Sequence, residues 1–132
     1  MKVEVFSKKV HELGIDTITG IPDSTLSTFC DYIGNEGKDV FFHHLVPENE
    51  GASIGIAIGE YLATGKPACV YMQNSGIGNI VNPITSLANR EVYGIPMLLV
   101  IGWRGEPGIA DEPQHKFMGK ITKEILGVLD IE

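Results

Sequence analysis

Apolar residues recur along this chain at regular helical spacing. Near the N-terminus, Val3, Phe6, Val10 and Leu13 stand three or four positions apart, which places their side chains on one face of a helix. Gly14 follows directly and predicts the end of that helix. The same spacing predicts further helices at 24–34, 51–63 and 80–88, and a short last helix at 121–126.

Short apolar runs lie between these helices and predict strands at 16–19, 40–44, 68–72 and 97–101. The run 68–72 is continuously apolar, which is typical of a parallel strand that is covered on both faces. Strands that alternate with helices in this way predict an α/β fold with three layers, α/β/α, around a doubly wound, mostly parallel sheet. No linker or repeat divides the sequence, so residues 1–132 are predicted to form one domain.

The composition narrows the possible functions. Apolar residues make up 43% of the chain and charged residues 20%, so we expect a globular protein rather than a disordered one. A net charge of −7 argues against a nucleic-acid partner, because phosphate binding requires clustered Lys and Arg. No apolar run is long enough to cross a bilayer, and Cys30 and Cys69 lack the spacing of metal ligands. We therefore expect a cytoplasmic protein with reduced thiols, no metal site of its own and no membrane contact.

Residues suited to binding or catalysis follow each of the predicted strands. These segments are Gly20 to Ser24, Glu48 and Glu50, Asn74 to Gly78, and the loop from Gly102 to His115, which also carries Arg104. In a parallel sheet the carboxyl ends of the strands lie at one edge, where open α/β sheets bind ligands. We therefore expect these segments to converge on one site.

The acidic pair Glu48 and Glu50 has two interpretations. Both are predicted to lie in the first turn of the helix at 51–63, where a carboxylate stabilises the positive end of the helix dipole. The same position is also the crevice at the end of a strand, where a carboxylate can share a proton with a ligand. We expect one of the two to have this second role.

The other candidates also have structural alternatives. Asp23 and Ser24 are ordinary helix caps, and His115 is equally compatible with a solvated loop. Gly76 and Gly78 either form a tight turn or cradle a phosphate, although the full G-x-G-x-x-G pattern of dinucleotide-binding loops is missing. A further stripe of glycines, at 51, 55 and 59, predicts close contact with another helix, for example in a second subunit.

Several motifs together carry a family resemblance. They are GIPDS at 20–24, VPENEGASIGIA at 46–57, YMQNSGIGN at 71–79, NPITSL at 82–87, IGWRGEPG at 101–108 and DEPQH at 111–115. This set resembles the pyrimidine-binding domain of thiamine-diphosphate-dependent decarboxylases. Within them it is most similar to the phosphonopyruvate decarboxylases, with sulfopyruvate decarboxylases as near relatives. The resemblance covers nearly the whole chain.

The resemblance implies roles for the residues that match its motifs. A glutamate of this family hydrogen-bonds a ring nitrogen of the cofactor's aminopyrimidine, and the match places it on Glu50 rather than Glu48. The pyrimidine ring is expected to lie against the backbone of the following segment. Its residues are Asn74, Ser75, Gly76, Ile77 and Gly78.

The resemblance also suggests residues that act on the substrate. Asp23 and Ser24 fall where relatives place a proton-transfer or substrate-binding residue. His115 falls in a loop where relatives hold two adjacent catalytic histidines, whereas this chain has only one. Arg104 could bind a phosphonate or sulfonate through its guanidinium, or it could form an ordinary surface salt bridge.

The family's diphosphate and Mg²⁺ are held by a separate domain whose Gly-Asp-Gly motif is absent from this sequence. The chain is therefore expected to be either one subunit of a two-chain enzyme or one piece of a longer polypeptide, working with a diphosphate-binding domain in a homo- or hetero-oligomer. The predicted reaction converts phosphonopyruvate to phosphonoacetaldehyde and CO2. The alternatives are a sulfopyruvate decarboxylase α subunit and a non-catalytic domain that serves binding or assembly.

Overall fold

The computed structural model describes residues 2–35, 41 and 43–131. The first half contains α1 (Val3–Glu12), β1 (Thr17–Gly20), the 3-10 turn η1 (Ser24–Leu26), α2 (Ser27–Asn35), β2 (His43–Leu45) and α3 (Glu50–Thr64). The second half contains β3 (Ala68–Gln73), the 3-10 turn η3 (Asn74–Gly76), α4 (Ile77–Pro83), the π-helical turn η4 (Ile84–Ala88), β4 (Met97–Gly102) and α5 (Pro113–Val128).

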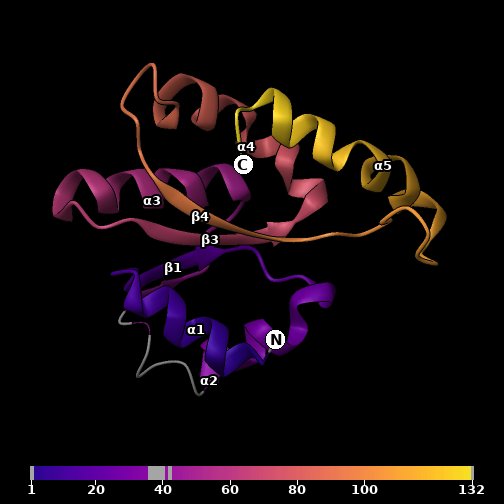
Figure 1. Cartoon of the computed structure of the whole chain (residues 1–132), viewed down its shortest axis with the longest axis horizontal. Helices are drawn as coiled ribbons and strands as arrows, with labels where there is room; N and C mark the ends of the chain where they lie inside the picture. Colours follow the sequence, from indigo (N-terminus) through magenta and orange to yellow (C-terminus); the bar gives the residue numbers. More distant parts are fainter. Residues whose placement is uncertain (1, 36–40, 42, 132) are drawn as a thin grey trace.

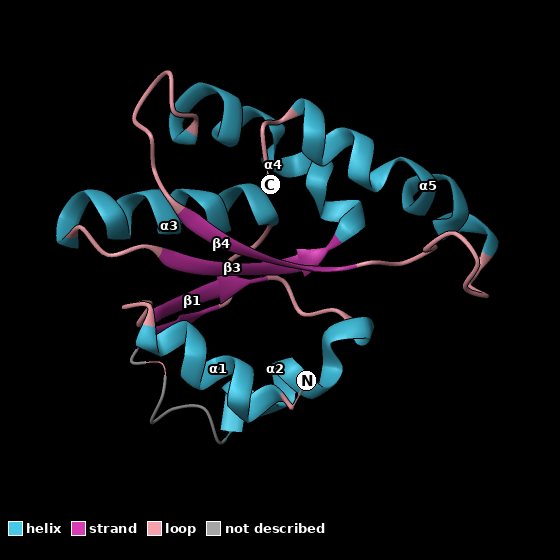
Figure 2. Cartoon of the chain, viewed as in Figure 1, coloured by secondary structure: helices cyan, strands magenta, loops and turns pink. Residues whose placement is uncertain are grey.

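The described strands form a parallel sheet in the order β2-β1-β3-β4. Helices α1 and α2 cover one face of this sheet, and α3, α4 and α5 cover the other (Figures 1 and 2). The predicted three-layer α/β fold is therefore confirmed. All carboxyl ends of the strands lie along one edge, which is where the sequence places its candidate residues.

Each layer of helices packs over its own hydrophobic core. Under α3, α4 and α5 the buried side chains include Ile54, Val70 and Ile80. Under α1 and α2 they include Ile18 and Phe29. The side chains of β3 pack alternately into the two cores, because successive side chains of a strand point to opposite faces of the sheet. The prediction of a strand covered on both sides is correct for β3.

The helix that carries the acidic pair has defined ends. The side chain of Asn49 caps α3 by accepting a hydrogen bond of 2.9 Å from the backbone N–H of Ala52. Gly65 ends the helix in the left-handed conformation, with φ of +73°, and its N–H donates to the carbonyl of Tyr61. Glu50 is the first residue of this helix, whereas Glu48 lies in the bend before it. The expectation that both glutamates share the first turn is wrong.

The edges of the sheet differ from the predictions. We expected a buried strand at 40–44, but β2 is an edge strand and its residues are exposed. Phe41 just before it is buried, while Val40 and Phe42 lie outside the described residues. The other edge strand, β4, extends one residue beyond the predicted range 97–101, to Gly102, and is mostly only half-buried, whereas we expected a buried strand. Hydrophobicity along the chain cannot distinguish an inner strand from an edge strand, because strand order is set by the fold.

The last helix is also longer than predicted. α5 starts at Pro113 and runs for 16 residues, so His115 lies in its first turn rather than in a loop. Proline is favoured at the first position of a helix, because its missing N–H would have no partner there. The polar run around it favoured a loop and concealed this start signal.

Both cysteines are free thiols in this structure, Cys69 buried and Cys30 half-buried. Burial raises the pKa of the Cys69 thiol to about 12, so it stays protonated at neutral pH. Within the described residues, none of the helices has the length and apolar character needed to cross a membrane.

Candidate functional site

The carboxyl ends of β1, β3 and β4 are joined by side chains. Asp23 follows β1 and accepts a hydrogen bond from Gln73 at the end of β3. Ser24 lies next to Arg104, which follows β4. The guanidinium atom Nη1 of Arg104 is 3.3 Å from Oγ of Ser24. The segments that follow β1, β3 and β4 therefore converge at this edge of the sheet, as predicted.

Glu50 reaches this edge from the start of α3. A Cβ atom added to Gly76 would lie 2.5 Å from Oε1 of Glu50, so the carboxylate rests against the bare backbone of that glycine. Its Oε2 accepts a hydrogen bond of 2.7 Å from Nδ2 of Asn79 on α4. Among the described residues, no donor reaches Oε1. The carboxylate is thus held by a hydrogen bond at Oε2, while Oε1 lies against Gly76 without a donor among the described residues.

Gly76 is needed for this close approach rather than for an unusual turn. Its φ of −71° is helical, and the segment that contains it leads directly into α4. Gly78 is exposed, with no atom near the position of its missing Cβ. The sequence offered a tight turn or a phosphate cradle for this pair, but the structure shows the beginning of a helix.

Asp23 is a half-buried carboxylate with a donor on each oxygen. Its Oδ2 accepts from the backbone N–H of Thr25 at 3.0 Å and from the Thr25 hydroxyl, and its Oδ1 accepts from Nε2 of Gln73. Burial by itself would raise the pKa of Asp23, but the hydrogen bonds from Thr25 and Gln73 outweigh it and lower the pKa. Asp23 is therefore ionised at neutral pH.

Asn74 fixes the backbone around the site. Its side chain is buried, donates 2.9 Å hydrogen bonds to the carbonyl of Arg104 and to Thr122 of α5, and accepts one from the N–H of Arg104. The side chain therefore points into the protein. The resemblance assigns contact with the pyrimidine to the backbone of Asn74, and the side chain is already occupied inside the protein.

Arg104 forms a bidentate ion pair with Asp111. Its Nε and Nη2 lie 2.8 and 2.6 Å from the two carboxylate oxygens, which also accept from the backbone N–H groups of Gly105 and Glu112. The guanidinium holds the pKa of Asp111 well below its usual range. Of the two interpretations of Arg104, the salt bridge is present in the structure, and Nη1 remains directed toward Ser24.

His115 is half-buried in the first turn of α5, where its N–H donates to the carbonyl of Glu112 at 3.0 Å. Its backbone carbonyl packs against Gly105, which has a φ of +68° and no room for a side chain. Sequence reasoning missed two residues that shape the site, Gln73 and Asn79. Both flank the motif segment 74–78, so their place in the motif was the available signal.

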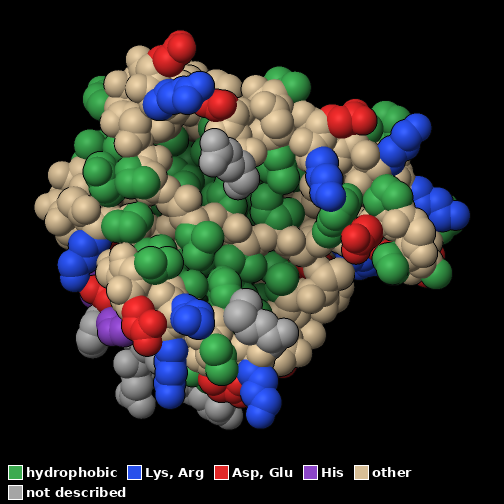
Figure 3. Space-filling model, viewed as in Figure 1, with side chains coloured by type: hydrophobic (Ala, Val, Ile, Leu, Met, Phe, Trp, Pro, Cys, Tyr) green, Lys and Arg blue, Asp and Glu red, His purple; other side chains and the backbone are tan. Residues whose placement is uncertain are grey.

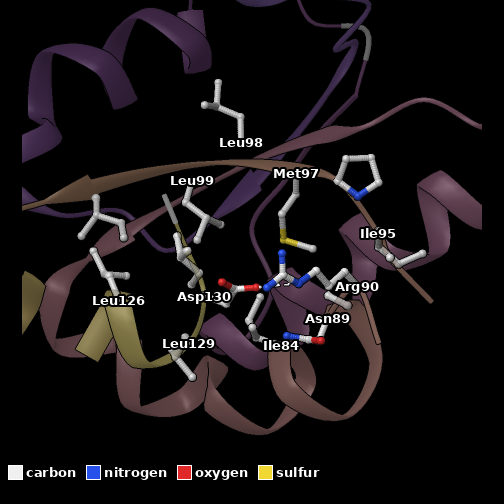
Figure 4. Close-up of a pocket in the computed structure, with 15 residues that line it drawn as sticks. Ile84, Asn89, Arg90, Ile95, Met97, Leu98, Leu99, Leu126, Leu129 and Asp130 are labelled. Atoms are coloured by element: carbon white, nitrogen blue, oxygen red, sulfur yellow. Dashed lines mark ion pairs between the residues drawn. The ribbon is translucent and has the colours of Figure 1, made fainter. Parts of the chain in front are cut away.

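A separate cavity of about 670 Å³ lies along the open side of β4, away from these residues. Figure 4 shows its apolar lining, with Leu99 of β4 facing Leu126 and Leu129 at the end of α5. An ion pair of 3.0 Å between Arg90 and Asp130 lies across it. Figure 3 shows hydrophobic side chains gathered in the middle of the same face of the molecule. Arg90 and Asp130 are thus paired with each other, and the rest of the lining is mostly apolar.

Comparisons with known proteins show which family the chain resembles. The chain is 38% identical over 120 residues to a phosphonopyruvate decarboxylase from Streptomyces hygroscopicus, covering 91% of this chain and 28% of that protein. It is 36% identical to a sulfopyruvate decarboxylase α subunit from Methanococcus maripaludis, covering 97% of this chain and 72% of that subunit. The chain therefore spans less than a third of the first relative and most of the second.

A solved structure of a thiamin diphosphate-dependent enzyme from Mycobacterium smegmatis shares the fold, with a TM-score of 0.66 and 23% sequence identity over 91% of this chain and 23% of that one. The family model for the N-terminal TPP binding domain of thiamine pyrophosphate enzymes matches residues 2–125. With nearly its whole length matched, the chain belongs to the thiamine pyrophosphate enzyme family as an N-terminal TPP binding domain.

Proposed function

We propose that this chain is the pyrimidine-binding part of a thiamine-diphosphate-dependent decarboxylase that converts phosphonopyruvate to phosphonoacetaldehyde and CO2. The observation that carries the proposal is the carboxylate of Glu50, which rests on the bare backbone of Gly76. A heterocycle with a basic nitrogen suits these features, because the glycine lets the carboxylate lie against the backbone, and Oε1, which has no donor among the described residues, can exchange a proton with a ring nitrogen.

When bound, thiamine diphosphate supplies the electron sink for loss of CO2 from a 2-oxo acid. The chain's own residues bind and orient it. Glu50 holds or accepts a proton at Oε1, while Asn79 keeps the carboxylate turned toward Gly76. The backbone from Asn74 to Gly78 provides the surface for the ring, including Ser75 and Ile77.

The substrate groups lie along the same edge. Ser24 and Nη1 of Arg104 are proposed to contact the acidic group of the substrate, although Asp111 already neutralises much of the guanidinium charge. Asp23 and His115 are proposed to assist proton transfer. Asp23, being ionised, suits the role of acceptor. Mg²⁺ belongs to the partner domain in this proposal, since the described residues contain no group of three acidic, His or Cys side chains that could hold it.

Two alternatives have specific support. The match over 72% of a sulfopyruvate decarboxylase α subunit favours a separate subunit that acts on sulfopyruvate. The exposed Gly55 and Gly59 on α3, with open space beside both, favour a surface that contacts another subunit, and this would also suit a non-catalytic assembly domain. Oligomeric assembly and a cytoplasmic location remain part of the proposal.

The substitution Glu50→Gln tests the proposal in the holoenzyme assembled with a diphosphate-binding domain. We expect kcat to fall about 100-fold or more, because the amide cannot exchange the proton, while cofactor binding is partly kept. Glu48→Gln is the matched control. Glu48 is exposed and precedes the helix, so this variant should retain wild-type kcat.

Equal turnover in Glu50→Gln and the wild type would rule out the proposed role of Glu50. A wild-type holoenzyme that decarboxylates neither phosphonopyruvate nor sulfopyruvate would rule out the decarboxylase role and leave the assembly domain. The substrate is decided by comparing kcat/KM for phosphonopyruvate and sulfopyruvate. If kcat/KM is much lower for phosphonopyruvate than for sulfopyruvate, sulfopyruvate is the substrate.

A further inference from the structure

Gln73 connects two parts of the site. It is the last residue of β3, and its side-chain amide binds on both sides. The amide Nε2 donates to Asp23 across to the end of β1, and the amide Oε1 accepts a hydrogen bond of 2.7 Å from Ser75. Ser75 belongs to the segment that passes beneath the Glu50 carboxylate. The amide therefore links the candidate proton acceptor to the candidate cofactor surface.

The hydrogen bond from Gln73 to Asp23 is not needed for Asp23 to cap the turn η1. Asn49 caps α3 with a single bond from the backbone N–H of Ala52. Asp23 already receives the corresponding bond from Thr25 at Oδ2 and a second one from the Thr25 hydroxyl. The additional donor reaches Oδ1 from a residue 50 positions away. Capping of η1 does not account for it.

Other groups near Asp23 do not replace this donor. The charge of Arg104 interacts with Asp23, but Nε and Nη2 of the guanidinium are bound to Asp111. Cys30 of α2 also faces Asp23, and burial raises the pKa of its thiol, so it carries no charge at neutral pH. Gly102 at the end of β4 contributes only bare backbone, since any side chain there would overlap Asp23 and Thr25. Among the described residues, Gln73 is therefore the side-chain donor to Oδ1, and the Thr25 hydroxyl and the backbone N–H groups of Thr25 and Ser24 also lower the pKa of Asp23.

We propose that Gln73 is a positioning residue that keeps the Asp23 carboxylate ionised and fixed in orientation for proton transfer at the carboxyl edge. This inference rests on the proposed function, because it assigns Asp23 a part in that reaction. Gln73 itself is not expected to touch the substrate. Its contribution passes through the hydrogen bond to Oδ1.

The first test measures the ionisation of Asp23 directly in this chain. Carboxyl ¹³C NMR titration of the wild type is compared with Gln73→Met, which keeps the length of the side chain and removes the donor, and with Gln73→Glu, which adds a like charge. We expect the pKa of Asp23 to rise in both variants, by about one pH unit or more in Gln73→Glu. Asn82→Asp is the matched control, because it adds the same charge on an exposed position of α4 and should leave the titration unchanged.

The second test measures whether the ionisation of Asp23 affects catalysis. In the holoenzyme, the acid-side inflection of kcat/KM against pH should move upward in the Gln73 variants by the same amount as the Asp23 titration. An Asp23 titration that does not move, or one that moves while the kinetic inflection stays in place, would overturn the inference. If Gln73→Glu does not fold, Gln73→Met decides. An inactive wild-type holoenzyme would instead overturn the proposed function.

Discussion

At the scale of single residues, close packing around Glu50 distinguishes the two acidic positions. The sequence resemblance favours Glu50 over Glu48, and the structure places only Glu50 within the helix and against Gly76. Spacing alone could not identify the partner Asn79, because it lies 29 positions away. Gln73 was missed for the same reason.

Gly76→Ala tests this packing. The added methyl group would overlap the Glu50 carboxylate, so we expect a loss of cofactor affinity and a destabilisation of about 1–3 kcal/mol, as for other overpacked sites. Gly34→Ala on α2 is the control, because its position is exposed, open and outside the proposed cofactor surface. It should leave affinity unchanged and stabilise the helix by about 0.5–1 kcal/mol. Isothermal titration calorimetry of the holoenzyme measures the cofactor affinity, and chemical denaturation measures the free energy of unfolding. Unchanged affinity in Gly76→Ala would show that the carboxylate position is unimportant.

At the scale of elements, the segment between β4 and α5 is held at both ends by side chains. Arg104 and Asp111 pair across it, and the Trp103 indole N–H donates to the carbonyl of Gly119 at 2.8 Å. Lys123 lies over the Trp103 ring at 4.9 Å, which adds a cation–π contact. The sequence predicted this segment as a loop and named its charged residues. It could not predict their pairing, because an Arg in a polar loop has many possible partners.

The substitution Asp111→Asn tests this pairing through its pH dependence. The folded-state pKa of Asp111 is lowered, so its stabilising effect is fully present above its unfolded pKa of about 3.9 and is lost as pH falls through the folded value. We expect Asp111→Asn to unfold at a lower temperature than wild type at pH 7 and the difference to shrink below about pH 4. Thermal unfolding followed by circular dichroism from pH 7 to 2 measures this. A difference that does not depend on pH would point to lost hydrogen bonds rather than lost charge.

At the scale of the whole molecule, the proposed function divides the cofactor between this chain, which takes the ring at its carboxyl edge, and a partner domain, which takes the diphosphate. A diphosphate with Mg²⁺ requires oxygen ligands near the phosphates. The chain also spans only 28% of the phosphonopyruvate decarboxylase that it resembles. Full cofactor binding is therefore expected to need a second domain.

We predict that this chain binds thiamine diphosphate at least about tenfold more tightly in the presence of a diphosphate-binding domain and Mg²⁺ than alone, which corresponds to about 1.4 kcal/mol or more. Calorimetry with and without the partner measures the difference. Thiamine without the diphosphate is the control, because its binding should gain less from the partner. Equal affinity for thiamine diphosphate in the two experiments would contradict the division of the cofactor between two domains.

The sequence by itself determined the layers of this fold, because hydrophobic periodicity reports directly which residues of a helix or strand face a core. It also determined which segments reach the carboxyl edge, since alternating strands and helices leave few other topologies. Strand order, the edge positions of β2 and β4, and the contacts of Glu50, Asp23 and Arg104 were decided only by the tertiary structure. The bonds of Glu50 to Asn79, Asp23 to Gln73 and Arg104 to Ser24 join residues 29, 50 and 80 positions apart, whose approach is set by packing of the whole domain rather than by any local pattern.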